Sequence, residues 1–289
     1  MRLMLSRKGY DSSTGGCPSP IFPDGELCSL PIPSADDLRL EEVGHRGRNL
    51  GDVASQLSGD THRATSGTHL DPDLDAGARP RLAGWRPCFG QTLAAQTHLE
   101  NRSVGLGDLF LFFGWFREVE TVDGRWRFRS GAPDIHCIFG WLQVGSIYRL
   151  DRGDEPPSWA CEHPHVRNAD LYRSARSHNT LYVASERLKL PGVAGRLPGG
   201  GVFSGYAPGL RLTAPGSSTR SLWRLPTCFE PRPGAPPLSY HAGPKRWSRD
   251  GDAVLLRTAG RGQEFVLDCD SYPGVYDWLA GVFRAAGQT

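Results

Sequence analysis

The segment THLDPDLD places His69, Asp71 and Asp73 at alternate positions. Residues two apart point to the same side of an extended chain, so His69 and Asp71 can present a nitrogen and a carboxylate oxygen to one ion. A further histidine, His163 or His165 of EHPHVRN, would complete the two-histidine, one-carboxylate set that holds non-haem iron. The spacing predicts a metal site at His69, Asp71 and His165, although a solvated acidic loop explains the same residues.

A metal at these residues would make the protein an iron-dependent oxygenase or another metalloenzyme. In that case Arg173 or Arg176 would anchor the carboxylate of an oxo-acid cosubstrate. The residues indicate a divalent metal as the cofactor without specifying which one.

The N-terminal loop LSRKGYDSSTGGCPSP is the second stretch with chemical potential. Adjacent glycines allow backbone amides to converge on an anion, and the cations and hydroxyls around them suit a phosphate. The loop lacks the G-x-x-x-x-G-K-[ST] pattern of a P-loop, and a solvated surface turn is the alternative. Its candidate phosphate-binding residues are Arg7, Lys8, Ser12, Ser13, Gly15 and Gly16.

The segment GQTLAAQTHLENRSV predicts a helix over Leu93–Asn101, with Thr92 as its N-cap. Gln91, His98 and Arg102 line one side of it and could approach a phosphate or a base edge. The candidate substrate ligands from this segment are Gln91 and Gln96. The candidate catalytic residues of the whole chain are His69, Asp71, Asp73, His98 and Asp11.

These residues need a scaffold, and the apolar segments predict a β-rich one. GDLFLFFGWFREVE and DIHCIFGWLQVGSIYRL are expected to form two paired strands that each carry a Phe-Gly-Trp triplet. Further strands are expected at Arg2–Leu5, HNTLYVAS and LRLTAP. DAVLLRTA and QEFVLDC are expected to form a hairpin.

The C-terminal segment predicts an amphipathic helix, since apolar residues recur at helical spacing from Val275 to Phe283, with Ser271 as a candidate cap. Residues 34–87 are rich in polar residues and are expected to form a long excursion with little regular structure. The fold class is therefore α+β: one β-rich domain over residues 1–289, with a mixed or antiparallel sheet, a middle helix and a C-terminal amphipathic helix.

Composition limits the classes of function. A net charge of +2 and a pI near 8.2 are too mild for a dedicated nucleic-acid-binding domain, which usually has a pI above about 9, but they are compatible with binding of a nucleotide or a short single strand. The seven cysteines are odd in number and form no C-x-x-C pair, so we expect a reducing, cytoplasmic location. The N-terminus lacks the apolar core of a signal peptide, and the longest apolar run is too short for a membrane helix.

Several long strings of the sequence resemble the nucleotide modification associated domain 3 family. They are LSRKGYDSSTGGCPSPIFPDGELCSLPIP, THLDPDL, FGQTLAAQTHLENRSVGLGDLFLFFGWFR and IFGWLQVGSIY, and the resemblance extends from Met1 to at least His241. It implies a role in modifying nucleotides or nucleic-acid bases, with a nucleotide or nucleic acid as the partner. It implies no particular reaction.

Three hypotheses follow. The favoured one is an enzyme that holds the phosphate of a nucleotide or nucleic acid with its N-terminal loop, in which case the polar residues above should converge in one pocket. The second is a non-catalytic reader of modified bases with an aromatic slot that includes Trp115 and Trp141. It draws on the similarity of V-x-x-G-D-L-F-L-F-F to a strand entry in PUA-like barrels. The third is the metalloenzyme.

Overall fold

The computed structural model describes residues 1–172, 178–193, 195–260 and 262–287. Two long strands form its centre: β8 (Leu109–Val122) and β10 (Ile135–Arg149), which pair antiparallel. The run from Leu109 to Phe113 is almost completely buried, as expected for a strand covered on both faces. The two Phe-Gly-Trp triplets lie on these paired strands, as predicted.

The main sheet is mixed and has nine strands, which confirms the predicted α+β class. Its principal order is β16-β1-β8-β10-β11-β7, where β1 runs parallel to β8 and the other neighbours on this path are antiparallel. Short strands β2 and β9 pair with β8, and β12 pairs with β10. The bounds are β1 Arg2–Arg7, β2 Ser19–Ile21, β7 Cys88–Gln91, β9 Arg125–Phe128, β11 Thr180–Ala184, β12 Gly200–Val202 and β16 Glu264–Asp268.

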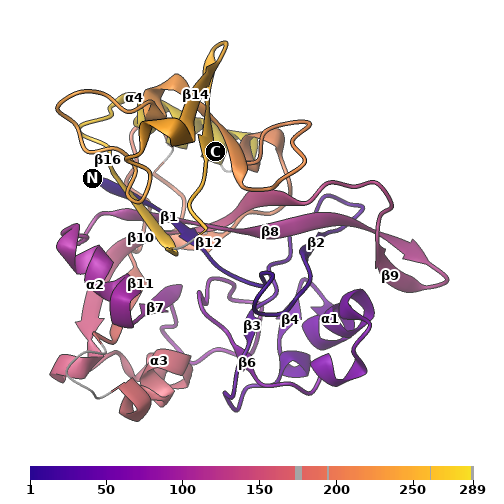
Figure 1. The fold of residues 1–289 in the computed structure, drawn as a ribbon. Coiled ribbons are helices and arrows are strands. Elements are labelled where there is room, and N and C mark those ends of the chain that lie inside the picture. Colours follow the sequence, from indigo (N-terminus) through magenta and orange to yellow (C-terminus); the bar gives the residue numbers. More distant parts are fainter. Residues whose placement is uncertain (173–177, 194, 261, 288–289) are drawn as a thin grey trace.

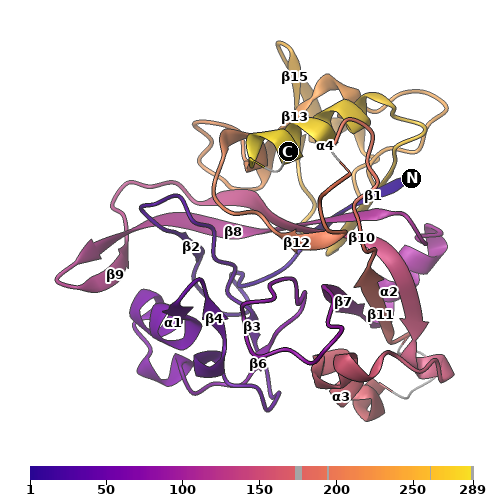
Figure 2. The ribbon, with the colours of Figure 1, turned by 180° about the vertical axis from the view of Figure 1, so that it is seen from behind.

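The chain covers the two sides of the β8 and β10 pair with different parts of the sequence (Figures 1 and 2). On one side lie the C-terminal helix α4 (Gly274–Ala285) and a three-stranded sheet of order β13-β15-β14. The other side carries the N-terminal third, with α1 (Leu50–Ser58) and two small two-stranded sheets, β3-β6 and β4-β5. The short strands are β3 Ile32–Pro33, β4 Gly44–His45, β5 Arg48–Asn49, β6 Thr68–His69, β13 Leu222–Pro226, β14 Trp247–Asp250 and β15 Ala253–Arg257.

Residues 34–87 are more regular than predicted. They contain α1, several short strands and 3-10 helices, and they contribute to a second apolar cluster with Tyr10, Phe22 and Leu30. The apolar face of α1 follows the helical spacing Leu50, Val53, Ala54 and Leu57, and Asn49 caps the helix by accepting from the backbone of Asp52. The expectation of little regular structure was wrong because these apolar residues are scattered singly among many polar ones.

Two strand predictions were also wrong. β15 and β16 form no hairpin, because the tight turn at Gly251 folds β15 back onto β14, while β16 pairs with β1 in the main sheet. The segment LRLTAP makes only isolated bridges, at Arg211 with Cys137 and at Thr213 with Trp223. A short apolar run does not specify the strand with which it pairs, and in this fold the segment forms single bridges in place of a strand ladder.

Two helix predictions were right. α2 spans Leu93–Asn101 with Thr92 at its N-cap position, and α4 buries Val275, Leu279, Val282 and Phe283. Ser271 does not cap α4: Pro273 holds the N-cap position, and the Ser271 hydroxyl donates to Asp268. The remaining helical turns are α3 Pro164–Arg167 and the 3-10 helices Leu40–Glu42, Thr61–Arg63, Leu150–Arg152, Ser158–Glu162, Ala169–Tyr172, Pro208–Leu210, Thr227–Phe229 and Pro244–Arg246.

All seven cysteines are free thiols. Among the described residues, the helices are too short and too polar to cross a bilayer.

A buried histidine makes the stability of the fold depend on pH. His241 donates from Nδ1 to the Ser239 carbonyl at 2.7 Å and accepts at Nε2 from the Ala259 amide at 3.0 Å, which fixes a neutral imidazole. Burial lowers the pKa of His241 to about 4, with a further contribution from the charge of Arg246. The unfolded chain therefore binds more protons between the ordinary histidine pKa and about 4, so this contribution to stability is lost as the pH falls through that window.

We expect His241→Asn to weaken this pH dependence. Between pH 7.5 and pH 5.0 the wild type should lose about 2 kcal/mol of unfolding free energy that the variant does not lose. Urea titrations at both pH values measure the difference, with exposed His62→Asn as the control. A gap between wild type and His241→Asn that stays constant with pH would contradict the assignment.

Candidate functional site

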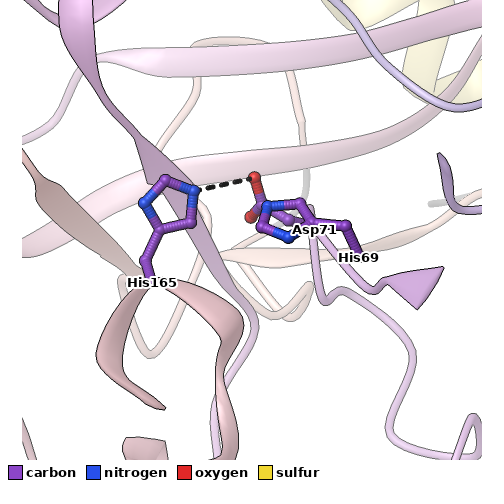
Figure 3. Close-up of side chains that lie close together, drawn as sticks. All are labelled: His69, Asp71 and His165. Carbon is purple, nitrogen blue, oxygen red and sulfur yellow. Dashed lines mark ion pairs between the residues drawn. The ribbon is translucent and has the colours of Figure 1, made fainter. Parts of the chain in front are cut away.

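Three side chains from two segments of the sequence meet beside the main sheet. His69 ends β6, Asp71 follows two residues later, and His165 lies in α3. One potential ligand atom from each lies within 4.8 Å of the others (Figure 3). The structure thus brings together the three residues that the sequence proposes as metal ligands.

Hydrogen bonds orient both imidazoles. His69 donates from Nδ1 to the Asp36 carboxylate at 2.7 Å, and His165 donates from Nδ1 to the side-chain oxygen of Asn179, also at 2.7 Å. In the neutral rings Nε2 then carries the lone pair. Histidines that bind metals are commonly held in this way, with the other ring nitrogen bonded to a carboxylate or carbonyl oxygen.

The Asp71 carboxylate is buried and held on one of its two oxygens. Oδ1 accepts from the Gly90 amide at 2.7 Å and lies 3.2 Å from His163 Nε2. His163 accepts at Nδ1 from the amide of His165, so its proton is on Nε2, the nitrogen that lies 3.2 Å from Asp71. Oδ2 lies 3.9 Å from His165 Nε2 and is the oxygen left for an ion.

The electrostatics favour positive charge between these groups. Burial alone would raise the pKa of Asp71, but the hydrogen bond from His163 and the charges of the three histidines hold it well below its usual range. Burial also opposes protonation of His69, yet the bond to Asp36 and the charge of Asp71 raise its pKa. Burial lowers the pKa of His165 to about 4, so near neutral pH its Nε2 can bind a cation.

Gly90 allows His165 to approach the sheet. A Cβ at this position would lie 2.2 Å from His165 Cδ2, and the Gly90 amide is the group that donates to Asp71. We expect Gly90→Ala to displace the imidazole and weaken metal binding by about tenfold to a hundredfold, the range for lost support of a ligand. Competition with a chelator measures this, and Gly105→Ala, which has open space around it, is the control. Equal affinity in both variants would contradict the packing argument.

A cavity of about 210 Å³ lies against these ligands, and residues far apart in the sequence line it. The end of β1 and the N-terminal loop form one wall, β7 another, and α3 a third. Its polar lining includes Arg7, Lys8, Asp11, Thr14, His69, Asp71, Gln91, Thr92, His165 and Gln263. The cavity thus brings the basic loop to the His-x-Asp pair, which is part of the convergence that the enzyme hypothesis requires.

The sequence model of the family described as nucleotide modification associated domain 3 matches residues 2–268. The chain belongs to this family. No curated protein and no solved structure matches it. Membership gives a function associated with nucleotide modification, and the matched range includes every residue of the cavity.

The N-terminal loop of this family member begins with two cations, Arg7 and Lys8, and an ion pair neutralises Lys8. Lys8 Nζ lies 3.0 Å from Glu264 Oε1, and Gln91 donates to the same oxygen at 2.6 Å. Arg7 instead donates to the carbonyls of Gly260 and Gly262, which carry no net charge. Arg7 therefore gives the cavity its positive charge, and Gln91 connects β7 to Glu264.

The loop glycines do not form the predicted anion site, because Asp11 occupies the loop amides. Its Oδ1 accepts from the backbone of Ser13 and Thr14, and its own carbonyl accepts from Gly16. Burial opposes ionisation, but these bonds and the charge of Arg7 lower the pKa of Asp11. Asp11 is thus the internal anion of the turn, and Gly15 and Gly16 lie outside the lining of the cavity.

Gly15 has a packing role that Gly16 lacks. Both have positive φ (+94° and +78°), but a Cβ at Gly15 would lie 2.3 Å from the Tyr10 ring, whereas Gly16 faces open space. We expect Gly15→Ala to lose about 1–3 kcal/mol more unfolding free energy than Gly16→Ala, which carries only the backbone strain. Urea denaturation of the two variants measures this, and equal losses would show that Tyr10 does not restrict the loop.

Three predicted site residues serve the fold elsewhere. Asp73 accepts a hydrogen bond from each terminal guanidinium nitrogen of Arg81, both at 2.6 Å, and lies outside the cavity lining. Gln96 is buried and accepts from the Tyr182 hydroxyl at 3.0 Å. His98 lies in α2, where its Nε2 is 3.0 Å from the Ser239 hydroxyl. None of the three lines the cavity.

The aromatic slot is also not formed as predicted. Trp141 is 2% exposed and packs against Phe203 and Phe283 in the core. Trp115 is partly exposed, and the Arg220 guanidinium lies 4.2 Å above its ring. Arg173 and Arg176 lie outside the described residues.

Sequence reasoning missed two residues that support the candidate ligands. Asp36 and Asn179 bond to His69 and His165 from 33 and 14 positions away. Both are common polar residues in irregular segments, and no local pattern distinguishes them. His163 was considered as an alternative ligand, and in the structure its Nε2 lies beside Asp71 instead. Gly90 had a weak signal, a glycine between two buried strand residues.

Proposed function

We propose that this protein is a metal-dependent enzyme that modifies a phosphate-bearing nucleotide or a base of a nucleic acid. The observation that carries the proposal is that two oriented histidines and one carboxylate share a cavity with the unpaired charge of Arg7. Family membership supports the substrate class, and the donor set supports the metal.

The donor set fits a first-row divalent ion. Two neutral imidazole nitrogens and one carboxylate oxygen with open positions are the set that non-haem Fe(II) enzymes use, and we propose iron. Three ligands at about 2.0–2.2 Å on one face of an ion lie about 3 Å apart. The candidate ligand atoms of His69, Asp71 and His165 lie within 4.8 Å of one another, so the side chains must close by up to about 1.8 Å when the ion binds. Bound there, the ion would supply Lewis-acid or redox chemistry at the reacting base.

The other residues have assigned roles in this proposal. Asp36 and Asn179 hold the ring orientations of His69 and His165, and His163 with Gly90 holds Asp71 Oδ1. Arg7 is the group that attracts the phosphate, by charge and by its donor fork. Lys8 and Gln91 keep the buried carboxylate of Glu264 bonded at the cavity wall.

A non-catalytic reader of modified bases has less support. It requires exposed stacking rings, and Trp141 is part of the core. The free thiols of all seven cysteines suit a reducing compartment, and we propose the cytoplasm as the location.

Metal content tests the proposal. The wild type, purified without a polyhistidine tag and reconstituted anaerobically with Fe(II), should hold about one ion per chain, as one three-ligand site requires. His69→Ala and His165→Ala should lose it, while exposed His62→Ala should retain it. Elemental analysis with parallel Mn(II) and Zn(II) reconstitutions gives the content and the preference.

Two results would contradict the proposal. A wild type that stays free of metal after all three reconstitutions would remove His69, Asp71 and His165 as ligands. Equal metal content in His69→Ala and His62→Ala would place any bound ion elsewhere.

A further inference from the structure

We call the cavity of about 210 Å³ beside His69, Asp71 and His165 the metal cavity. A second cavity, of about 670 Å³, adjoins the metal cavity and shares Arg7, Asp11 and Gln263 with it. We refer to it as the basic cleft. Its other walls come from the N-terminal loop, from Trp115 of β8 and from residues 219–221 and 258–260. The basic cleft therefore continues the metal cavity along the surface on the side of the three-stranded sheet.

Two arginines give the cleft its charge. Arg220 donates to the Ser12 hydroxyl and lies over the Trp115 ring at 4.2 Å, and Arg7 is bonded to carbonyls. Within the described residues, neither guanidinium lies within ion-pair distance of a carboxylate. The one carboxylate of the lining, Asp11, is held by its own turn. Hence both positive charges remain available to an anion.

A buried donor also faces the cleft. His136 is 5% exposed and accepts at Nδ1 from the indole of Trp223 at 2.9 Å, so the proton of the neutral ring is on Nε2. Burial, with the charges of Arg220 and Arg7, lowers the pKa of His136 to about 3, so the ring stays neutral and its N–H remains a donor. No partner for Nε2 occurs among residues 1–172, 178–193, 195–260 and 262–287.

The volumes of the two cavities indicate which part of a substrate each one can hold. Pockets for a single small ligand measure about 300–1,000 Å³. At about 210 Å³ the metal cavity is below that range and accommodates only the reacting group, whereas the basic cleft at about 670 Å³ has room for a ligand of its own. A substrate that fills both extends beyond one nucleotide.

We propose that the basic cleft binds the backbone and a flanking base of a single-stranded nucleic acid whose target base enters the metal cavity. Arg7 and Arg220 contact phosphates, and the flanking base stacks on the face of the Arg220 guanidinium opposite the Trp115 ring. Basic grooves with aromatic and arginine stacking surfaces bind single strands in this way. A target base that enters the metal cavity must be out of the duplex stack. This inference deepens the proposed function and rests on it.

Fluorescence anisotropy at fixed salt tests the inference, with a labelled twelve-nucleotide single strand of mixed sequence as DNA and as RNA. The wild type should bind one or both strands at least tenfold more tightly than the matching duplex, and tenfold more tightly than mononucleotides in competition. Arg220→Ala should weaken strand binding by about tenfold and reduce the salt slope by about one. Ser12→Asp, an exposed position that adds a negative charge beside Arg220, should weaken it as well. Arg125→Ala, which removes the same charge from exposed β9, should leave binding unchanged.

Metal content of the same samples separates this inference from the proposed function. Loss of strand affinity in Arg220→Ala and Ser12→Asp with normal metal content supports the cleft. Equal binding by wild type, Arg220→Ala and Arg125→Ala, or mononucleotides that compete as well as the strand, would overturn the inference and leave the metal site intact. A wild type that binds the strand without ever holding metal would overturn only the enzymatic proposal.

Discussion

The candidate site depends on the removal of one carboxylate from water. The Asp71 side chain is 5% exposed, and a buried anion is tolerated only when it is fully paired and hydrogen-bonded. The amide of β7 and the histidine that precedes α3 stabilise its Oδ1, and Oδ2 faces the two candidate ligands as the oxygen left for an ion. Three segments that share no regular structure are thereby fixed around one point, and the cavity wall follows from their positions.

The strand order of the main sheet places positive charge at the cavity beside Asp71. β1 lies between β16 and β8, so its C-terminal residues Arg7 and Lys8 emerge next to Glu264 and beside β7. Glu264 is 1% exposed, forms an ion pair with Lys8 and accepts a hydrogen bond from Gln91. This pairing leaves Arg7 as the cation that two adjoining cavities share. The N-terminal loop thus acquires a defined place through the parallel register of β1 with β8.

The two cavities differ in what surrounds the charge. Imidazole and carboxylate groups line the first, which suits a metal ion and a reacting group. Arginines, hydroxyls and one indole line the second, which suits phosphate and stacked bases. Membership in a family associated with nucleotide modification agrees with both proposals, and Arg7 lines both cavities.

The sequence by itself determined the features that depend on local periodicity or spacing. These are the strands β8 and β10, the helices α2 and α4, and the proximity of His69 to Asp71, because residues two apart are neighbours in any extended chain. The tertiary structure alone decided which histidine joins that pair, since β11 and α3 must pack before His165 can reach Asp71. It also assigned Asp73 to Arg81, Lys8 to Glu264 and Asp11 to its own turn. Each of these carboxylates has the same chemistry in the sequence, and only its burial and its partners separate a ligand from a structural ion pair.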